Sequence, residues 1–217
     1  SREKNFFGGH GIVGAQVPIA AGLAFSNKYL GNNKIAFGYF GDGAANQGQI
    51  YETFNMASLW KLPIIFVIEN NQYAMGTSME KASSSPALYS RGQAFNIPGE
   101  AVDGMDVLAV KLAGNIAAKH CRSGKGPYIL EMNTYRYRGH SMSDPAKYRT
   151  REEVNKIKAA RDPIENLKAY LISEKMLDET DLKELDASIK KEMLEAADFA
   201  INSNLPSENE LWTDVYI

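Results

Sequence analysis

Residues 34–78, KIAFGYFGDGAANQGQIYETFNMASLWKLPIIFVIENNQYAMGTS, contain two apolar segments separated by a helical pattern. The segments at 35–40 and 64–68 are rich in β-branched and aromatic residues, as buried strands of parallel sheets are. Pro63 marks the point where the intervening helix has ended. A strand, a helix and a second strand in this order predict a βαβ unit. The apolar residues with roughly helical spacing are Ile50, Phe54, Ala57 and Leu59.

Polar residues follow both apolar segments, at the points where the predicted strands end. They are GDGAANQG at residues 41–48 and ENNQY at residues 69–73. Because the carboxyl ends of parallel strands meet at one edge of a sheet, where open α/β folds bind ligands, we expect Asp42 and Asn71 to approach one another. A carboxylate and an amide oxygen, with a backbone carbonyl, phosphate oxygens and water, are ligands that an octahedral Mg²⁺ ion accepts. The pattern therefore predicts a magnesium site at this edge.

The glycines of the same segment predict a seat for a diphosphate. Gly41 and Gly43 permit close approach of the backbone and positive φ, and the amide groups that open the following helix attract an anion. Three competing motifs do not fit. A dinucleotide fingerprint requires a glycine where Asn46 stands, an EF-hand requires an oxygen ligand where Ala44 stands, and the Gly-Lys-Ser/Thr of a Walker loop is missing from this segment.

Composition excludes several classes of function. The net charge of −2 and the scattered Lys and Arg argue against a nucleic-acid-binding surface, and the 217 residues include no long apolar span for a membrane. Cys121 is the only cysteine, so it forms no internal disulfide. We expect a reducing compartment and a buried, inert thiol.

The rest of the chain predicts elements around this unit. Asp106 caps a helix over residues 107–122, whose apolar face we expect to be Leu108, Leu112, Ile116 and Ala117. The helix over residues 181–201 carries an apolar stripe, which we assign to stability or to subunit contact. The remaining predictions are a helix over 16–29 ended by Gly31, a polar loop over 76–86, a short helix over 87–95, a strand over 128–134, and helices over 152–159 and 163–175.

The triplet Gly41-Asp42-Gly43, followed after a strand, helix and strand by Asn70-Asn71, resembles the thiamine diphosphate-binding motif. Residues 41–78 as a whole resemble the alpha subunit of the pyruvate dehydrogenase component of the 2-oxoacid dehydrogenase complexes. Further segments carry the same resemblance, which covers nearly all of the chain: GGHGIVGAQVPIAAG at 8–22, CRSGKGP at 121–127 and YRYRGHSMSDP at 135–145.

The resemblance implies a doubly wound α/β fold with a mainly parallel sheet, the thiamine diphosphate-binding fold. We expect a cofactor-binding domain over residues 1–148 and a C-terminal helical extension over residues 149–217. The resemblance also implies a further N-terminal segment in the family's alpha subunit, and this sequence begins after it.

The resemblance also implies the site residues. Three of them are expected to bind the metal, namely Asp42, Asn71 and Tyr73. Those expected to bind the cofactor are Gly11, Val13, Gly41, Asp42, Gly43, Ala44, Asn71, Tyr73 and His140. Main-chain groups of Gly11 and Val13 would contact the aminopyrimidine, although a flexible lead-in to the first helix is the simpler interpretation of this glycine-rich segment.

His140 is expected to be catalytic, near the diphosphate and the reacting centre, and Ser141 matches a serine that is phosphorylated in regulated mitochondrial relatives. The alternative is a solvated loop whose arginines pair with Asp144 or Glu69. Because the expected partners of these polar side chains include the diphosphate, we expect the loop to become ordered when the cofactor binds.

The activity that the resemblance implies is oxidative decarboxylation of pyruvate with thiamine diphosphate and Mg²⁺, and acetyl transfer to lipoamide. The glutamate that activates the cofactor belongs to the beta subunit in this family, so we expect two alpha and two beta subunits and a lipoyl acyltransferase core as partners. The alternatives are an alpha subunit for branched-chain 2-oxoacids or acetoin, and a non-catalytic scaffold of the same fold. The expected compartment is the cytoplasm of a bacterium, in preference to a mitochondrial matrix.

Overall fold

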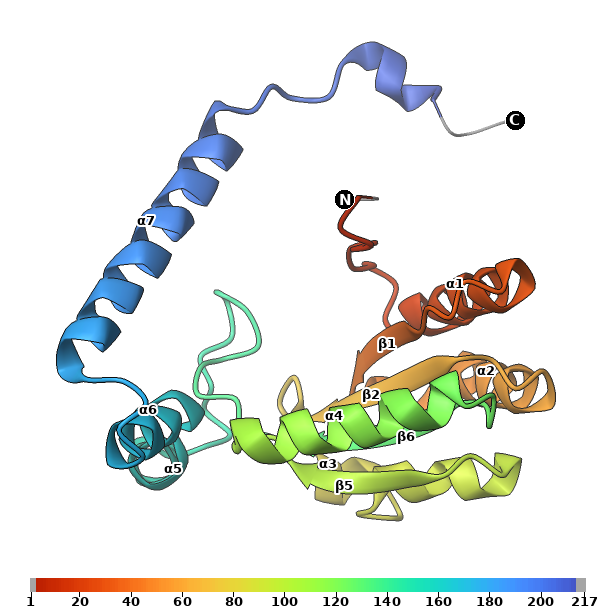
Figure 1. Ribbon diagram of the computed structural model, residues 1–217, viewed down its shortest axis with the longest axis horizontal. Coiled ribbons are helices and arrows are strands. Elements are labelled where there is room, and N and C mark those ends of the chain that lie inside the picture. Colours follow the sequence, from red (N-terminus) through yellow and green to blue (C-terminus); the bar gives the residue numbers. More distant parts are fainter. Residues whose placement is uncertain (1–2, 214–217) are drawn as a thin grey trace. The chain divides into compact units, whose positions relative to one another are not determined.

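The structure is a computed structural model in which residues 3–213 are described (Figure 1). The chain divides into two compact units, Ser1–Asn166 and Leu167–Ile217. The first unit holds a parallel four-stranded sheet in the order β1-β2-β6-β5. Its strands are β1 (Ala36–Gly41), β2 (Ile64–Asn70), β5 (Gly99–Asp103) and β6 (Tyr128–Asn133).

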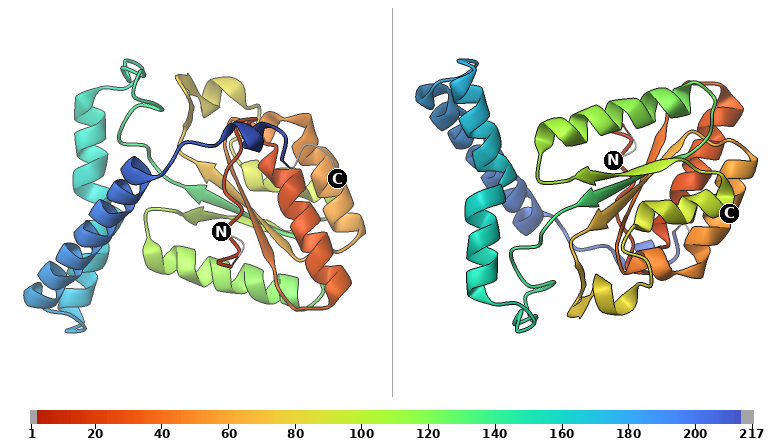
Figure 2. Two further views of the ribbon diagram at one scale, coloured as in Figure 1. Left: turned by 90° about the horizontal axis from the view of Figure 1, so that it is seen from above. Right: turned by 90° about the horizontal axis from the view of Figure 1, so that it is seen from below.

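Helices cover both faces of this sheet, as the two views of Figure 2 show. Helices α1 (Gln16–Leu30) and α2 (Gly48–Leu59) pack on one face, and α4 (Val107–Arg122) packs on the other. Side chains alternate across a strand, so Ile64, Phe66 and Ile68 of β2 enter one core while Ile65 and Val67 enter the other. The predicted doubly wound α/β fold, including the βαβ unit, is confirmed.

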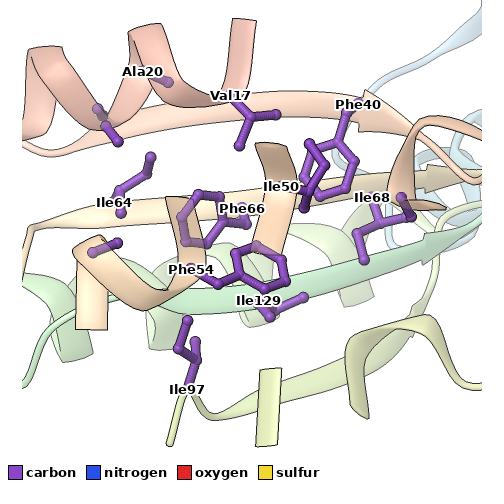
Figure 3. Packing of buried hydrophobic residues seen from close by; sticks show 14 of the residues in the cluster. Val17, Ala20, Phe40, Ile50, Phe54, Ile64, Phe66, Ile68, Ile97 and Ile129 are labelled. Carbon is purple, nitrogen blue, oxygen red and sulfur yellow. The ribbon is translucent and has the colours of Figure 1, made fainter. Parts of the chain in front are cut away.

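The larger core lies between β2 and helices α1 and α2 (Figure 3). The rings of Phe54 and Phe66 meet with centroids 4.7 Å apart, and both side chains are buried. Full burial of one such side chain contributes about 1.5–3 kcal/mol. Gly38 lets α1 approach β1, because a side chain there would meet the Ala20 Cβ atom at 3.2 Å.

The predicted apolar face of α4 is wrong at three of its four positions. Leu108, Leu112 and Ile116 are exposed, and the residues buried against the sheet are Ala113, Ala117 and Cys121. Both sets follow helical spacing, so the periodicity alone did not distinguish them. The smaller side chains face the sheet, where they let the helix axis lie close to β2 and β6.

The ends of two helices follow the predicted chemistry. The carboxylate of Asp106 accepts hydrogen bonds from the amides of Leu108 and Ala109, at 2.8 and 3.1 Å. Helix α1 ends at Gly31, whose φ of 62° is left-handed and costs glycine little. The start of α4 and the end of α1 were therefore predictable, because each is marked by a capping residue in the sequence.

The segment between β2 and β5 contains more structure than its polar sequence indicated. In place of a plain loop over 76–86 there are a small hairpin, β3 (Tyr73–Ala74) with β4 (Thr77–Ser78), and the short helix α3 (Met79–Ala82). These elements are two to four residues long, too short to produce a periodic pattern. The helix predicted over 87–95 is the 3₁₀ segment η2 (Leu88–Phe95).

The carboxyl-terminal part of the chain is helical, as predicted. Helix α5 (Arg151–Arg161) belongs to the first unit, α6 (Pro163–Ser173) spans the division, and α7 (Glu179–Asn202) belongs to the second unit and is followed by the 3₁₀ turn η3 (Glu208–Leu211). A capping box of Asp178 and Asp181 begins α7. The apolar stripe of α7 is exposed, so its role in stability or subunit contact stays a prediction. No helix within residues 3–213 is long and apolar enough to cross a membrane.

Candidate functional site

The carboxyl ends of β1, β2 and β6 bring the predicted site residues to one edge of the sheet. Gly41 pairs with Glu69, and Asn70 pairs with Asn133. The Asp42 amide continues the ladder to the Glu69 carbonyl at 3.3 Å. Asp42, Asn71 and the start of the loop after β6 therefore leave the sheet side by side.

Oxygen atoms at this edge converge on the guanidinium of Arg136. Its Nη1 atom donates to Asn71 Oδ1 at 3.3 Å and to the Tyr73 carbonyl at 3.0 Å. Its Nη2 atom donates to the Met75 carbonyl at 2.7 Å and to the Tyr148 hydroxyl at 2.8 Å. The positive charge of Arg136 also acts on the carboxyl group of Asp42. Two of the three predicted metal ligands thus contact one guanidinium, whose charge also acts on the third. A carboxylate, an amide oxygen and a backbone carbonyl are oxygen donors of the kind that Mg²⁺ accepts, with phosphate oxygens and water.

Asp42 is the only carboxylate among these three. Its side chain is 5% exposed, and burial raises its pKa, opposed by the amides of Asp42 and Gly43 and by Arg136. A divalent cation would favour the charged form further. Residues 3–213 contain no cluster of three or more His, Cys, Asp and Glu that could hold a metal. A metal at this edge would therefore have the Asp42 carboxylate and would otherwise depend on neutral oxygens and on an anionic cofactor.

The two glycines of the triplet serve two different purposes. Neither has positive φ, so that part of the prediction is wrong. A side chain at Gly43 would meet the Ala74 Cβ atom at 2.5 Å, so glycine there lets the β3–β4 hairpin lie against the triplet. A side chain at Gly41 would enter open space, which leaves that position accessible to a ligand.

The segment after the triplet forms the 3₁₀ turn η1 (Ala44–Asn46) and then α2. Within the described residues, no side chain caps α2 and its first turn has no acidic residue, so its positive end remains available for a phosphate. Arg91 fixes η1 from outside, with Nη1 donating to the Ala45 carbonyl at 2.8 Å and to Asn46 Oδ1 at 2.9 Å. Sequence reasoning missed Arg91, because no local motif marks it.

The glycine-rich segment before α1 lies beside the start of α2. The Val13 carbonyl accepts a hydrogen bond from Gln49 Nε2 at 3.1 Å, and Gln16 Nε2 donates to the Tyr39 carbonyl at 2.8 Å. Gly14 has a φ of 88° at this contact. These bonds tie the segment to α2 and the first residue of α1 to β1, while Gly11 and Val13 themselves are exposed.

Arg149, which sequence reasoning also missed, anchors the loop after β6. Its side chain donates to the carbonyls of Arg136 and Arg138, the latter at 2.8 Å. The guanidinium also lies over the rings of Tyr73, Tyr135 and Tyr148, between 5.2 and 5.6 Å from their centroids. The residue is 8% exposed. Arg149 thereby joins the loop to the turn that carries Asn71 and Tyr73.

Asp144 organises the tip of the loop. It accepts hydrogen bonds from the amides of His140 and Ala146 and from the Tyr148 hydroxyl, between 2.7 and 2.9 Å, and these bonds lower its pKa to about 2. Arg136 and Arg138 form no ion pair with Asp144 or Glu69 within residues 3–213.

The tip of the loop also holds the predicted catalytic residue. The His140 imidazole and the Ser141 hydroxyl are exposed. No hydrogen bond joins the imidazole to Asp42 among the described residues. Its catalytic role stays a prediction.

Cys121 lies away from this edge, in the core beneath α4. Its thiol donates to the Ile64 carbonyl at 3.4 Å, and burial raises its pKa to about 12. The expectation of a buried thiol is therefore confirmed, and a raised pKa agrees with low reactivity, which stays a prediction.

Comparison with known proteins agrees with the resemblance found in the sequence. Residues 1–208 match the family model described as "Dehydrogenase E1 component". A protein of Rhizobium meliloti (strain 1021), "Pyruvate dehydrogenase E1 component subunit alpha", is 57% identical over 217 residues, which are all of this chain and 62% of the relative. The protein of that name from Zymomonas mobilis is also 57% identical, over all of this chain and 61% of its own length.

The similarity extends to a mitochondrial form. "Pyruvate dehydrogenase E1 component subunit alpha, mitochondrial" of Dictyostelium discoideum is 53% identical over 99% of this chain and 56% of its own length. The chain thus spans less than two thirds of the length of these curated relatives.

Proposed function

The chain belongs to the dehydrogenase E1 component family, and we propose that it is the alpha subunit of a pyruvate dehydrogenase that uses thiamine diphosphate and Mg²⁺. The observation that carries this proposal is the convergence of Asn71 Oδ1 and the Tyr73 carbonyl on one cationic group that also acts on Asp42. When bound, thiamine diphosphate supplies the carbanion chemistry that breaks the bond to the carboxylate of a 2-oxoacid.

The residues of this chain would bind and orient that cofactor. Asp42, Asn71 and the Tyr73 carbonyl would hold the metal ion, which neutralises the diphosphate. Main-chain groups of the remaining cofactor residues would contact the phosphates and the aminopyrimidine, at Gly11, Val13, Gly41, Gly43 and Ala44. His140 would approach the reacting centre, where a histidine can take up or release a proton near neutral pH.

The proposed activity is decarboxylation of pyruvate and transfer of the acetyl group to lipoamide. It requires a beta subunit for the activating glutamate, in an assembly of two alpha and two beta subunits, and a lipoyl acyltransferase core. The bacterial and mitochondrial relatives are named alpha subunits of the pyruvate dehydrogenase E1 component, and this name supports the choice of pyruvate as substrate. We propose the cytoplasm of a bacterium as the compartment.

The proposal is tested by calorimetry of thiamine diphosphate binding to the full-length protein in its native assembly, with and without Mg²⁺. We expect Asp42→Ala or Asn71→Ala to abolish the Mg²⁺-dependent part of the affinity, because each removes a ligand. Glu52→Ala, at an exposed carboxylate of α2, is the matched control and should bind like the parent. Equal affinity of parent and Asp42→Ala would contradict the metal site, and a parent that binds no cofactor would indicate a non-catalytic scaffold.

A further inference from the structure

Glu131 is a buried carboxylate in the middle of the sheet that the proposed reaction does not use. Glu131 lies on β6 and is 1% exposed. It has no ion pair among the described residues. Its partners are two neutral donors, Asn70 Nδ2 at 2.7 Å and the Tyr89 amide at 2.9 Å. Burying a carboxylate without a cation costs free energy, and these two hydrogen bonds offset part of that cost.

The first partner, Asn70, controls the turn that follows β2. Asn70 is 1% exposed, and its Oδ1 atom accepts hydrogen bonds from both the amide and the side chain of Gln72, at 3.2 Å each. Gln72 has a φ of 75°, a left-handed conformation that is uncommon for residues other than glycine. The hydrogen bonds from Gln72 therefore hold a backbone conformation that the residue itself disfavours.

This turn determines where the proposed metal ligands lie. Asn71 and Tyr73 flank Gln72, and the oxygens they direct to Arg136 are Asn71 Oδ1 and the Tyr73 carbonyl. The Asn70 amide holds the turn only when its oxygen faces Gln72 and its nitrogen faces away. Acceptors on the nitrogen side select that orientation. Glu131 Oε1 makes the shortest of these contacts, at 2.7 Å, beside Met79 Sδ at 3.1 Å and Asn133 Oδ1 at 3.4 Å, and it is the one carboxylate among the three.

We propose that Glu131 is a positioning residue for the metal site, acting through Asn70 to set the separation of the Asn71 and Tyr73 oxygens. The inference rests on the proposed function, since it concerns the geometry of that site. Mg²⁺ requires nearly ideal octahedral geometry at 2.0–2.1 Å, whereas Ca²⁺ accepts looser arrangements at 2.3–2.6 Å. A positioning role therefore predicts that disturbing Glu131 weakens Mg²⁺ binding more than Ca²⁺ binding.

The test measures Mg²⁺ and Ca²⁺ affinities by calorimetry at saturating thiamine diphosphate, on the full-length protein in its native assembly. For Glu131→Gln we expect the Mg²⁺ affinity to fall about 10- to 100-fold, as for other outer partners of metal ligands, with a smaller loss for Ca²⁺. Glu100→Gln is the matched control, because Glu100 lies on the neighbouring strand and accepts from the Tyr128 hydroxyl at 3.1 Å. Its ratio of Mg²⁺ to Ca²⁺ affinity should equal that of the parent.

A double variant, Asn70→Asp with Glu131→Gln, exchanges donor and acceptor between the two positions. The amide introduced at position 131 can accept from the Tyr89 amide and donate to position 70, where the carboxylate can still accept from Gln72. The net charge is unchanged. We expect the double variant to recover most of the parent's Mg²⁺ to Ca²⁺ ratio, which a role in overall stability does not predict.

An unchanged ratio in Glu131→Gln, or equal losses for both ions together with a lower Tm, would overturn the positioning role. A double variant whose ratio stays as low as that of Glu131→Gln would also overturn it. If Glu131→Gln does not fold, the double variant is compared with the parent, and a Mg²⁺ to Ca²⁺ ratio well below the parent's would overturn the positioning role. A parent that binds thiamine diphosphate without any dependence on a divalent ion would overturn the proposed function itself, and this inference with it.

Discussion

Replacing Arg149 by Met should release the loop after β6 while leaving the sheet folded. The side chain makes two charge-assisted hydrogen bonds, to the carbonyls of Arg136 and Arg138, and lies over three tyrosine rings. Hydrogen bonds from charged groups contribute about 1.5–3 kcal/mol each. Losing both therefore costs at least about 3 kcal/mol, before any cation–π contribution of about 0.5–2 kcal/mol.

This loss applies to the opening of the loop more than to global unfolding, because the sheet has its own buried cores. About 3 kcal/mol corresponds to a change of roughly 150-fold in the opening equilibrium, since about 1.4 kcal/mol is tenfold. Hydrogen exchange measures it through the amides of His140 and Ala146, which are bonded to Asp144. Their protection should fall by that factor or to the level of an open chain, while amides of β2 keep theirs.

The control for this experiment is Arg151→Met, two residues further along. Arg151 is exposed in the first turn of α5 and makes none of the contacts of Arg149. Its replacement should leave the exchange of His140 and Ala146 unchanged. Equal protection of these amides in Arg149→Met and the parent would refute the anchoring role.

Three further predictions concern single contacts. Gly43→Ala should lower the Tm through the clash with Ala74, at a cost of about 1–3 kcal/mol, and Ala74→Gly in the same chain should restore it. Burial raises the pKa of the Cys121 thiol from 9.0 to about 12, so the contribution of the neutral thiol to the free energy of unfolding should be complete below pH 9 and be lost as the pH rises towards 12. Alkylation of Cys121 below pH 9 should require unfolding. Hydrogen bonds lower the pKa of Asp144 from 3.8 to about 2, so the protection of the loop amides against hydrogen exchange should persist above pH 3.8 and be lost as the pH falls towards 2. Asp144→Asn should remove this pH dependence of the protection.

The βαβ unit could be predicted from sequence because its signals are local. The apolar runs at β1 and β2, the helical spacing between them and the polar residues after each strand all lie within 45 consecutive positions. Once the strands are parallel neighbours, the proximity of Asp42 and Asn71 follows from the register. The resemblance in residues 41–78 then identified the family. The roles of the individual site residues remain predictions.

What the sequence determined by itself is therefore the order of the longer helices and of the strands of the βαβ unit, the capping of helices such as α4 by Asp106, and the edge of the sheet to which Asp42 and Asn71 come. The tertiary structure alone decided which face of α4 is buried, because two stripes with the same spacing compete and the fit against the sheet selects the smaller side chains. It also decided the polar contacts that support the site. Asn70 and Glu131 are 61 positions apart, and Asn71 and Arg136 are 65 apart. Such pairs leave no local pattern, since a hydrogen bond depends on the strand register and side-chain direction that only the folded chain supplies.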